Sequence, residues 1–285
     1  MSAPRTVAPE DLRKILVNAD KIVVKASPTR WSTILFKSTD KKDLEDLWSS
    51  LTLVPAAGEV HCMCDGTPAI YVYERGCERV ALTNHHGLSI RCSLWDSDVP
   101  ITDVEKWLSW FDKRRISAPR REVEAMRAQQ AENERDWERW LTAMPKGLST
   151  VWSNALGEFG RVKLDPLRSE LERSMPDRGE RILALLEWFG SGAGPWSGFP
   201  SYETAAENLL LDFSTAQIIA AIQSKGLSPA QTEGAARLFA GWSFGKQRPE
   251  ELKHLPNALR KDLWRHTQNT EDKDKYGRAR RAFAR

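Results

Sequence analysis

The residues best able to do chemistry in this chain are cysteines and histidines that cluster within one short stretch. They occur as His61-Cys62-Met63-Cys64, Cys77, His85-His86 and Cys92. Thiolate and imidazole groups are the usual ligands of structural zinc, and two sulfurs from one segment with histidines from a neighbour would suit a tetrahedral site. The candidate metal ligands are therefore Cys62, Cys64, His85 and His86, with zinc as the candidate ion.

The spacing of the cysteines nevertheless favours packing over metal binding. The local pattern predicts a strand over residues 60–64, in which side chains alternate, so the sulfurs of Cys62 and Cys64 would lie about 7 Å apart on one face. A zinc knuckle usually places two residues between its ligands so that the chain wraps the ion. Cysteine is also among the residues most often buried. The sequence thus predicts buried cysteines and no cofactor, and zinc or a reactive thiol is the alternative.

The two histidines lie in a predicted turn, His85-His86-Gly87. Adjacent strand residues face opposite sides, so both rings reach one site only if Gly87 allows the turn to distort. A hydrogen-bonded turn histidine is the favoured interpretation, and a general base or metal ligand is the alternative.

A loop rich in glycine and aromatic residues is the third candidate. Residues 190–203 read Gly-Ser-Gly-Ala-Gly-Pro-Trp-Ser-Gly-Phe-Pro-Ser-Tyr-Glu. A glycine-rich phosphate loop needs a strand before it, whereas a helix is predicted there. Either the aromatic side chains fill the groove between helices, or the loop binds a partner. In the second interpretation the binding residues are Trp196, Phe199, Tyr202 and Glu203.

No catalytic residues are predicted. The sequence contains no G-x-S-x-G, H-E-x-x-H or Walker A motif. The last segment, from residue 272 to the end, is basic and could contact nucleic acid, but it also has the pattern of an amphipathic helix. Basic residues at a helix C-terminus are favoured by the helix dipole, so a solvated last helix is the preferred interpretation.

Short strands and turns predict an α+β domain over residues 1–117. Runs rich in β-branched and aromatic residues at 21–27, 33–38 and between 59 and 94 are typical of strands, and Asp65-Gly66 and Arg75-Gly76 are hairpin signals. An antiparallel sheet is therefore expected. Capping residues and apolar spacing predict helices at 9–18, 39–51 and 103–113.

A charged helix over residues 118–145 is predicted to connect this domain to an all-α domain at residues 146–285. In the second domain short amphipathic segments are separated by proline or glycine, and Ser228-Pro229 and Asp165-Pro166 place proline at the start of a helix. This succession resembles the HEAT-like α-helical repeat proteins, which implies stacked helix pairs with a groove for a protein partner. An irregular helical bundle is the alternative.

The composition is typical of a soluble globular protein. The 285 residues include 41% hydrophobic and 28% charged residues, and 42 basic residues against 39 acidic ones leave a net charge of +3. No global field favours a polyanion, so nucleic acid is not an expected partner. The absence of a long apolar run or of a signal peptide argues against a membrane, and the free cysteines indicate the cytoplasm.

Two functions remain open from the sequence. The first is a non-enzymatic protein-protein interaction or scaffold protein, for example an immunity or regulatory protein, that binds a protein partner through its helical half and aromatic loop. The second is a metal-dependent or thiol enzyme centred on the strands that carry the cysteines and histidines.

Overall fold

The computed structural model describes residues 9–53, 62–95, 97–197 and 200–284. The chain divides into two compact units, Met1–Ala131 and Glu132–Arg285. The division falls within helix α4 (Ala118–Thr142), the charged helix that the sequence predicts as the connector. Each unit has a hydrophobic core of its own. An α+β fold class with an antiparallel sheet in the N-terminal part is confirmed.

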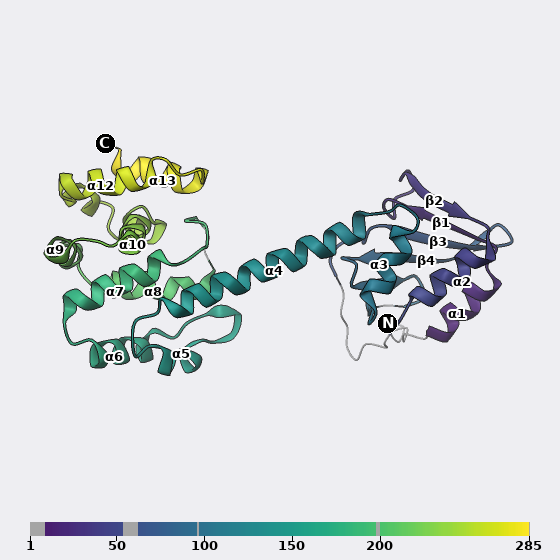
Figure 1. Ribbon diagram of the computed structural model, residues 1–285, viewed down its shortest axis with the longest axis horizontal. Coiled ribbons are helices and arrows are strands. Elements are labelled where there is room, and N and C mark those ends of the chain that lie inside the picture. Colours follow the sequence, from purple (N-terminus) through teal and green to yellow (C-terminus); the bar gives the residue numbers. More distant parts are fainter. Residues whose placement is uncertain (1–8, 54–61, 96, 198–199, 285) are drawn as a thin grey trace. The chain divides into compact units, whose positions relative to one another are not determined.

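An antiparallel sheet forms the centre of unit 1. In the described part of the chain it has six strands in the spatial order β2-β1-β3-β4-β5-β6 (Figure 1). Their bounds are β1 Lys21–Lys25, β2 Ile34–Ser38, β3 Ala69–Glu74, β4 Cys77–His85, β5 Ser89–Cys92 and β6 Val99–Pro100. The β3–β4 hairpin turns at Arg75 and Gly76, which both adopt positive φ, as the Arg-Gly pair predicts.

Three helices of unit 1 lie on one side of this sheet: α1 (Pro9–Asn18), α2 (Lys41–Ser50) and α3 (Val104–Asp112) (Figure 1). Strand side chains alternate between the two faces, and the set that includes Ile22, Val24 and Val72 is buried in a common core with the helices. The opposite set includes charged and aromatic residues that are partly buried or exposed, with Val23 and Ala69 buried among them. We call this second side the polar sheet face.

Unit 2 is helical over its described residues. Its α-helices are α5 (Ser149–Ala155), α6 (Leu164–Ser174), α7 (Arg178–Gly190), α8 (Thr204–Leu211), α9 (Thr215–Lys225), α10 (Pro229–Phe239), α11 (Trp242–Gln247), α12 (Asn257–Thr267) and α13 (Lys273–Phe283). Short 3-10 turns lie at Glu158–Gly160, Ser201–Glu203 and Glu251–His254. Ser214 and Ser228 each form a capping box with the glutamine three residues later, which fixes where α9 and α10 begin.

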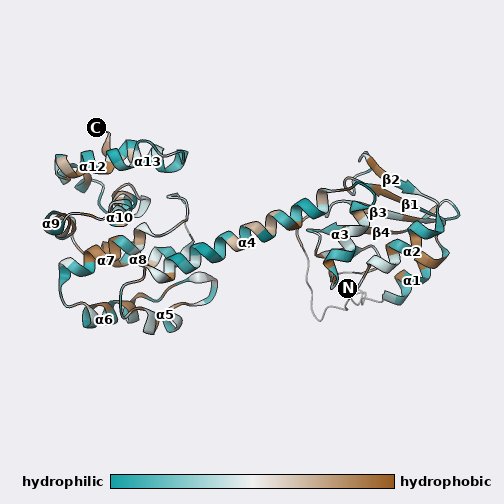
Figure 2. Ribbon diagram, in the orientation of Figure 1, coloured by the Kyte–Doolittle hydropathy of each residue, from teal (hydrophilic) through white to brown (hydrophobic). Residues whose placement is uncertain are grey.

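Helix α7 places six apolar side chains in the core of unit 2, and Figure 2 shows the apolar residues along it. It crosses α10 with the two backbones in contact through Gly190 and Gly234. A Cβ atom built on Gly234 would lie 1.8 Å from the carbonyl oxygen of Leu186, and one on Gly190 would lie 1.9 Å from that of Ala230. Only glycine fits at either position, because no side-chain atom can approach an oxygen that closely.

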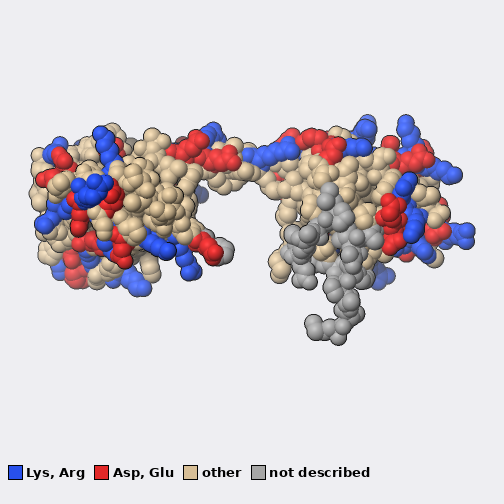
Figure 3. All heavy atoms as spheres, turned by 90° about the horizontal axis from the view of Figure 1, so that it is seen from below, with Lys and Arg blue, Asp and Glu red and all other residues tan. Residues whose placement is uncertain are grey.

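Charged side chains of both signs are interspersed over the surface seen in Figure 3, in agreement with the nearly balanced composition. Among the described helices, none combines the length and the apolar character that crossing a bilayer requires.

Candidate metal centre

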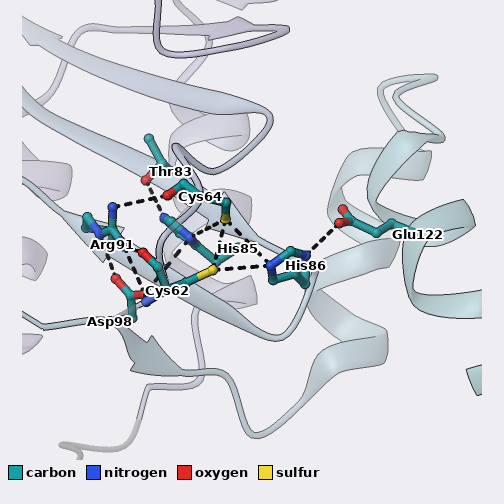
Figure 4. A network of polar contacts seen from close by, with 8 residues as sticks. All are labelled: Cys62, Cys64, Thr83, His85, His86, Arg91, Asp98 and Glu122. Carbon is teal, nitrogen blue, oxygen red and sulfur yellow. Dashed lines mark hydrogen bonds and ion pairs between the residues drawn. The ribbon is translucent and has the colours of Figure 1, made fainter. Parts of the chain in front are cut away.

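Two sulfurs and two histidine nitrogens meet beside the end of strand β4 (Figure 4). The sulfurs of Cys62 and Cys64 are 3.0 Å apart, and Nε2 of His86 lies 3.3 Å from the first and 3.5 Å from the second. These three ligand atoms all lie within 4.8 Å of one another. Nδ1 of His85 lies 3.1 Å from the sulfur of Cys64. Three of the four residues that the sequence offers as metal ligands thus form one group, and the fourth, His85, contacts that group at Cys64.

The prediction of a strand over residues 60–64 is wrong in its described part. Residues 62–64 are irregular and bent, so the two sulfurs converge instead of lying a two-residue strand repeat apart. The bend is held by Arg91, whose guanidinium donates to the carbonyl oxygens of Cys62 (2.6 Å) and Cys64 (3.3 Å). Asp98 accepts from the backbone N–H of Cys62 at 2.7 Å and from Nε of Arg91 at 2.7 Å. The spacing argument against a metal therefore loses its premise.

The turn after β4 distorts in the way that two adjacent histidines need in order to share a site. His86 has φ +55° and Gly87 has φ +70°, so the ring of His86 turns back toward the cysteines although His85 is the last residue of the strand. The segment after Cys64 also approaches closely, because a Cβ on Gly66 would lie 2.6 Å from Nε2 of His85. Glycine at this position lets the cysteine segment pack against the ring.

Each histidine is oriented by an oxygen on the side of the ring away from the sulfurs. Nδ1 of His86 donates to the carboxylate of Glu122 in α4 at 2.7 Å. Nε2 of His85 lies 3.0 Å from the hydroxyl oxygen of Thr83. In the neutral ring of His86 this leaves the lone pair of Nε2 directed at the cysteines. The same holds for Nδ1 of His85 when its Nε2 donates to the hydroxyl oxygen of Thr83. Metal-binding histidines are usually held in this way by a carboxylate or another oxygen.

The electrostatics of the cluster favour thiolate at one of its two sulfurs. Hydrogen bonding with Cys64, and then with His85 and His86, lowers the pKa of the Cys62 thiol to about 6. The hydrogen bond to Glu122 and then that to Cys62 raise the pKa of His86. Burial raises the pKa of the second thiol, Cys64. A divalent cation would relieve this conflict, since it stabilises both sulfurs in the deprotonated form.

The distances fit a tetrahedral ion of the size of zinc. With metal–sulfur bonds near 2.3 Å and metal–nitrogen bonds near 2.0 Å, the sulfurs would lie about 3.8 Å apart and each sulfur about 3.5 Å from a nitrogen. The sulfur–nitrogen distances here, from 3.1 to 3.5 Å, are close to that value. The two sulfurs, at 3.0 Å, would separate by somewhat less than about 1 Å to admit the ion.

A thiol nucleophile is the competing use of these residues. Cys62, His86 and Glu122 form a relay in which one ring nitrogen faces the sulfur and the other faces a carboxylate, the arrangement of a thiol activated by an oriented base. The second pair does not repeat it, because Nδ1 of His85 faces both the sulfur of Cys64 at 3.1 Å and the carboxylate of Asp98 at 4.0 Å. The relay uses the sulfur of Cys62 alone, whereas a metal ion would use both sulfurs, which lie 3.0 Å apart.

The remaining cysteines take no part in this cluster. Cys77 is exposed at the start of β4, and Cys92 is buried in the core of unit 1. The sequence predicts that the cysteines are buried, and of the four only Cys92 is buried.

The aromatic loop of unit 2 contributes mainly to packing. Trp196 is 4% exposed, and Glu203 is 1% exposed and paired with Arg237. Tyr202 is partly buried against the rings of Trp137 and Trp140, with centroids 4.7 and 5.9 Å away. Phe199 lies outside the described residues. The burial of Trp196 and Glu203 favours the structural interpretation of this loop over the binding interpretation.

Three residues around the cysteine–histidine cluster carry no recognisable signal in the sequence. Glu122 lies among the many charges of the connecting helix, and Arg91 and Asp98 lie in segments with only strand and loop character. No local pattern distinguishes them, because their roles arise from contacts made 7 to 36 residues away in sequence.

The comparisons with known proteins give no relative. No family model, no curated protein and no solved structure matches this chain. The function is therefore inferred from the geometry alone.

Proposed function

We propose that unit 1 is a zinc-binding domain in which Cys62, Cys64, His85 and His86 hold one ion. The convergence of the two sulfurs with Nε2 of His86 carries this proposal. Nδ1 of His85, which lies 3.1 Å from the sulfur of Cys64, is the fourth ligand of the proposal. Four protein ligands leave no open position for water or substrate, so the ion has a structural role. The ion holds the segment that carries Cys62 and Cys64 against the end of the sheet. A reducing compartment such as the cytoplasm keeps the two sulfurs available as ligands.

Contacts beyond the ligands support a metal site more than a chance meeting of side chains. Glu122 and Thr83 orient the histidines, and Arg91 and Asp98 shape the backbone that presents the cysteines. A core cysteine would need none of these contacts. Arg91 also places a positive charge near both sulfurs, which favours thiolate before the metal arrives.

Metal analysis of the full-length protein, purified without added chelator, tests the proposal. We expect about one zinc per chain, and a loss of zinc in Cys62→Ser and in His86→Ala. Cys77→Ser is the matched control, because it removes an exposed thiol of the same unit. Returning zinc to the stripped protein should raise the unfolding midpoint, since a ligand at a thousand times its Kd stabilises by about 4 kcal/mol.

Two results would overturn the zinc proposal. One is wild-type protein that neither contains zinc nor is stabilised by it. The other is that iodoacetamide alkylates Cys62 selectively and that added zinc does not slow this reaction. That result would favour the thiol relay with His86 and Glu122 instead.

The second candidate function is protein binding by unit 2, and an exposed tryptophan favours it. Trp242 is 65% exposed at the start of α11, with Nζ of Lys246 4.7 Å from the centroid of its ring. It borders a pocket of about 430 Å³ that is also lined by Arg278 and Arg281. An exposed tryptophan among basic side chains suits an acidic peptide.

Panning a library of acidic peptides against the full chain tests this second function. Peptides that bind the pocket should be lost with Trp242→Ala and kept with Val17→Ala, which removes an exposed apolar side chain from unit 1. If both variants enrich the same peptides, the pocket at Trp242 is not their binding site.

A further inference from the structure

The polar sheet face of unit 1 carries a second feature that the zinc proposal does not use. Where β2, β1 and β3 lie side by side, its side chains are basic and aromatic. In the register of these strands Lys21 faces Tyr73, while Val23 faces both Lys37 and Tyr71. The turn between β1 and β2 adds a tryptophan. We call Lys21, Lys25, Trp31, Lys37, Tyr71 and Tyr73 the basic-aromatic surface.

The aromatic members present their rings at the surface. Trp31 is 88% exposed, the highest value for any tryptophan among the described residues. Tyr71 and Tyr73 are half-buried, and lysine ammonium groups lie 4.9 and 4.1 Å from their ring centroids. A lysine ammonium lies over each tyrosine ring, so a base stacks there only when the flexible lysine moves aside, and a phosphate next to that base would attract the ammonium.

The charges of this surface are almost all of one sign. Within the described ranges, Lys21, Lys25 and Lys37 form no ion pair with a carboxylate, and neither does Arg30, which lies over the ring of Trp31 at 5.3 Å. One carboxylate borders the basic-aromatic surface: Glu78 on β4 is paired with Tyr73 on β3 in the strand register. The other charged groups on neighbouring strands are neutralised in pairs, Arg79 with Glu74 and Arg91 with Asp98.

We propose that the basic-aromatic surface binds single-stranded nucleic acid, with bases stacked on the rings and phosphates held by the lysines. Sheets that bind single strands combine stacking platforms with a basic groove. A duplex would hide its base faces from these rings, so the unpaired strand is the ligand that uses both features. The net charge of +3 for the whole chain does not indicate this surface, because acidic residues elsewhere offset its local excess of positive charge. This inference does not rest on the zinc site.

Fluorescence anisotropy of a labelled 20-nucleotide oligouridylate with the full chain tests the proposal. We expect binding at low salt that duplex RNA of the same length competes for poorly. Trp31→Ala should weaken affinity about tenfold, because it removes one base–aromatic stack. An 88% exposed side chain can be removed without loss of the fold, which an unchanged unfolding midpoint would verify.

The lysines are tested by salt dependence. The double variant Lys21→Gln/Lys25→Gln should reduce the slope of log K against log salt by about 1.4, or 0.7 for each lysine–phosphate ion pair removed. The control is Lys41→Gln/Lys42→Gln, which removes the same charge from exposed positions of α2 on the other side of the sheet. This control should keep the wild-type slope.

Three outcomes would overturn the proposal. The first is no binding at low salt. The second is equal affinity for duplex and single strand with no effect of Trp31→Ala, which would mean a simple polyanion surface. The third is competition by polyglutamate as strong as that by RNA, which would assign the surface to an acidic protein partner.

Discussion

The ion pair between Glu203 and Arg237 is the most deeply buried charged contact of unit 2. The side chains are 1% and 2% exposed. The guanidinium also donates to the carbonyl oxygens of Phe189 and Gly194, each at 3.0 Å. The carboxylate accepts from the backbone N–H groups of Ala193 and Gly194 at 3.1 and 3.2 Å. The pair therefore joins α10 to the loop at residues 190–203.

Removing either charge leaves the other buried without its partner, which costs about 3–5 kcal/mol of unfolding free energy. Glu203→Gln is the sharper change, because the amide oxygen can still accept from the loop while the negative charge disappears. Arg237→Met leaves the carboxylate with only the two loop N–H groups. For a unit of this size, the expected loss corresponds to a fall of roughly 10 °C in the unfolding midpoint.

A double-mutant cycle separates the ion pair from the other contacts. Glu203→Gln combined with Arg237→Met should cost less than the sum of the single changes by about 2 kcal/mol, because no unpaired charge remains. The matched control is the exposed pair Lys225–Glu180, with side chains 58% and 54% exposed. Its Met and Gln variants should each cost less than about 1 kcal/mol.

Urea titration of the full chain, followed by circular dichroism, gives the free energies of unfolding. Single variants that cost less than about 1 kcal/mol, or a cycle that is additive, would refute the reasoning. In that case the loop is not fastened by this pair, and the partner-binding interpretation of Glu203 would regain support.

Two further predictions concern unit 2. Gly234→Ala should cost more than about 2 kcal/mol, because the added Cβ would lie 1.8 Å from the carbonyl oxygen of Leu186, and urea titration would detect it; a neutral effect would contradict the close crossing. Burial raises the pKa of the Glu233 carboxyl, but hydrogen bonds from His266 and Lys275 outweigh it, so that this pKa lies below its usual value. The ionised Glu233 carboxylate therefore stabilises the folded state fully at pH values above its pKa in the unfolded chain. This stabilisation is lost as the pH falls through the lower pKa of Glu233 in the folded protein. Between about pH 5 and 3 wild type should therefore lose more stability than Glu233→Gln, and parallel loss in both would oppose this assignment.

Local signals in the sequence predict those elements whose turn or capping residues lie within the element itself. The hairpin at Arg75-Gly76 follows from a turn that needs positive φ, and α9 and α10 follow from capping serines. The boundaries of these elements depend on neighbours in the chain. The α+β class could be predicted for the same reason.

The cysteine–histidine cluster could be predicted only as a set of residue types. The local pattern predicts a straight strand at residues 60–64, whereas the backbone of residues 62–64 is bent by Arg91 and Asp98. Those contacts join segments 27 to 36 residues apart, and no local pattern encodes them. In the same way, the buried state of Glu203 depends on Arg237 from a distant helix, so composition alone suggests a surface loop.

The crossing of α7 and α10 through Gly190 and Gly234 restricts how this chain can change over evolutionary time. In most cores an enlarged side chain can be accommodated when its neighbour becomes smaller. Here both positions already hold the smallest residue, and the atoms opposite them are backbone carbonyl oxygens that no substitution removes. An added methyl group can be tolerated only if one whole helix shifts. Related chains should therefore either keep both glycines or differ in the spacing of these two helices.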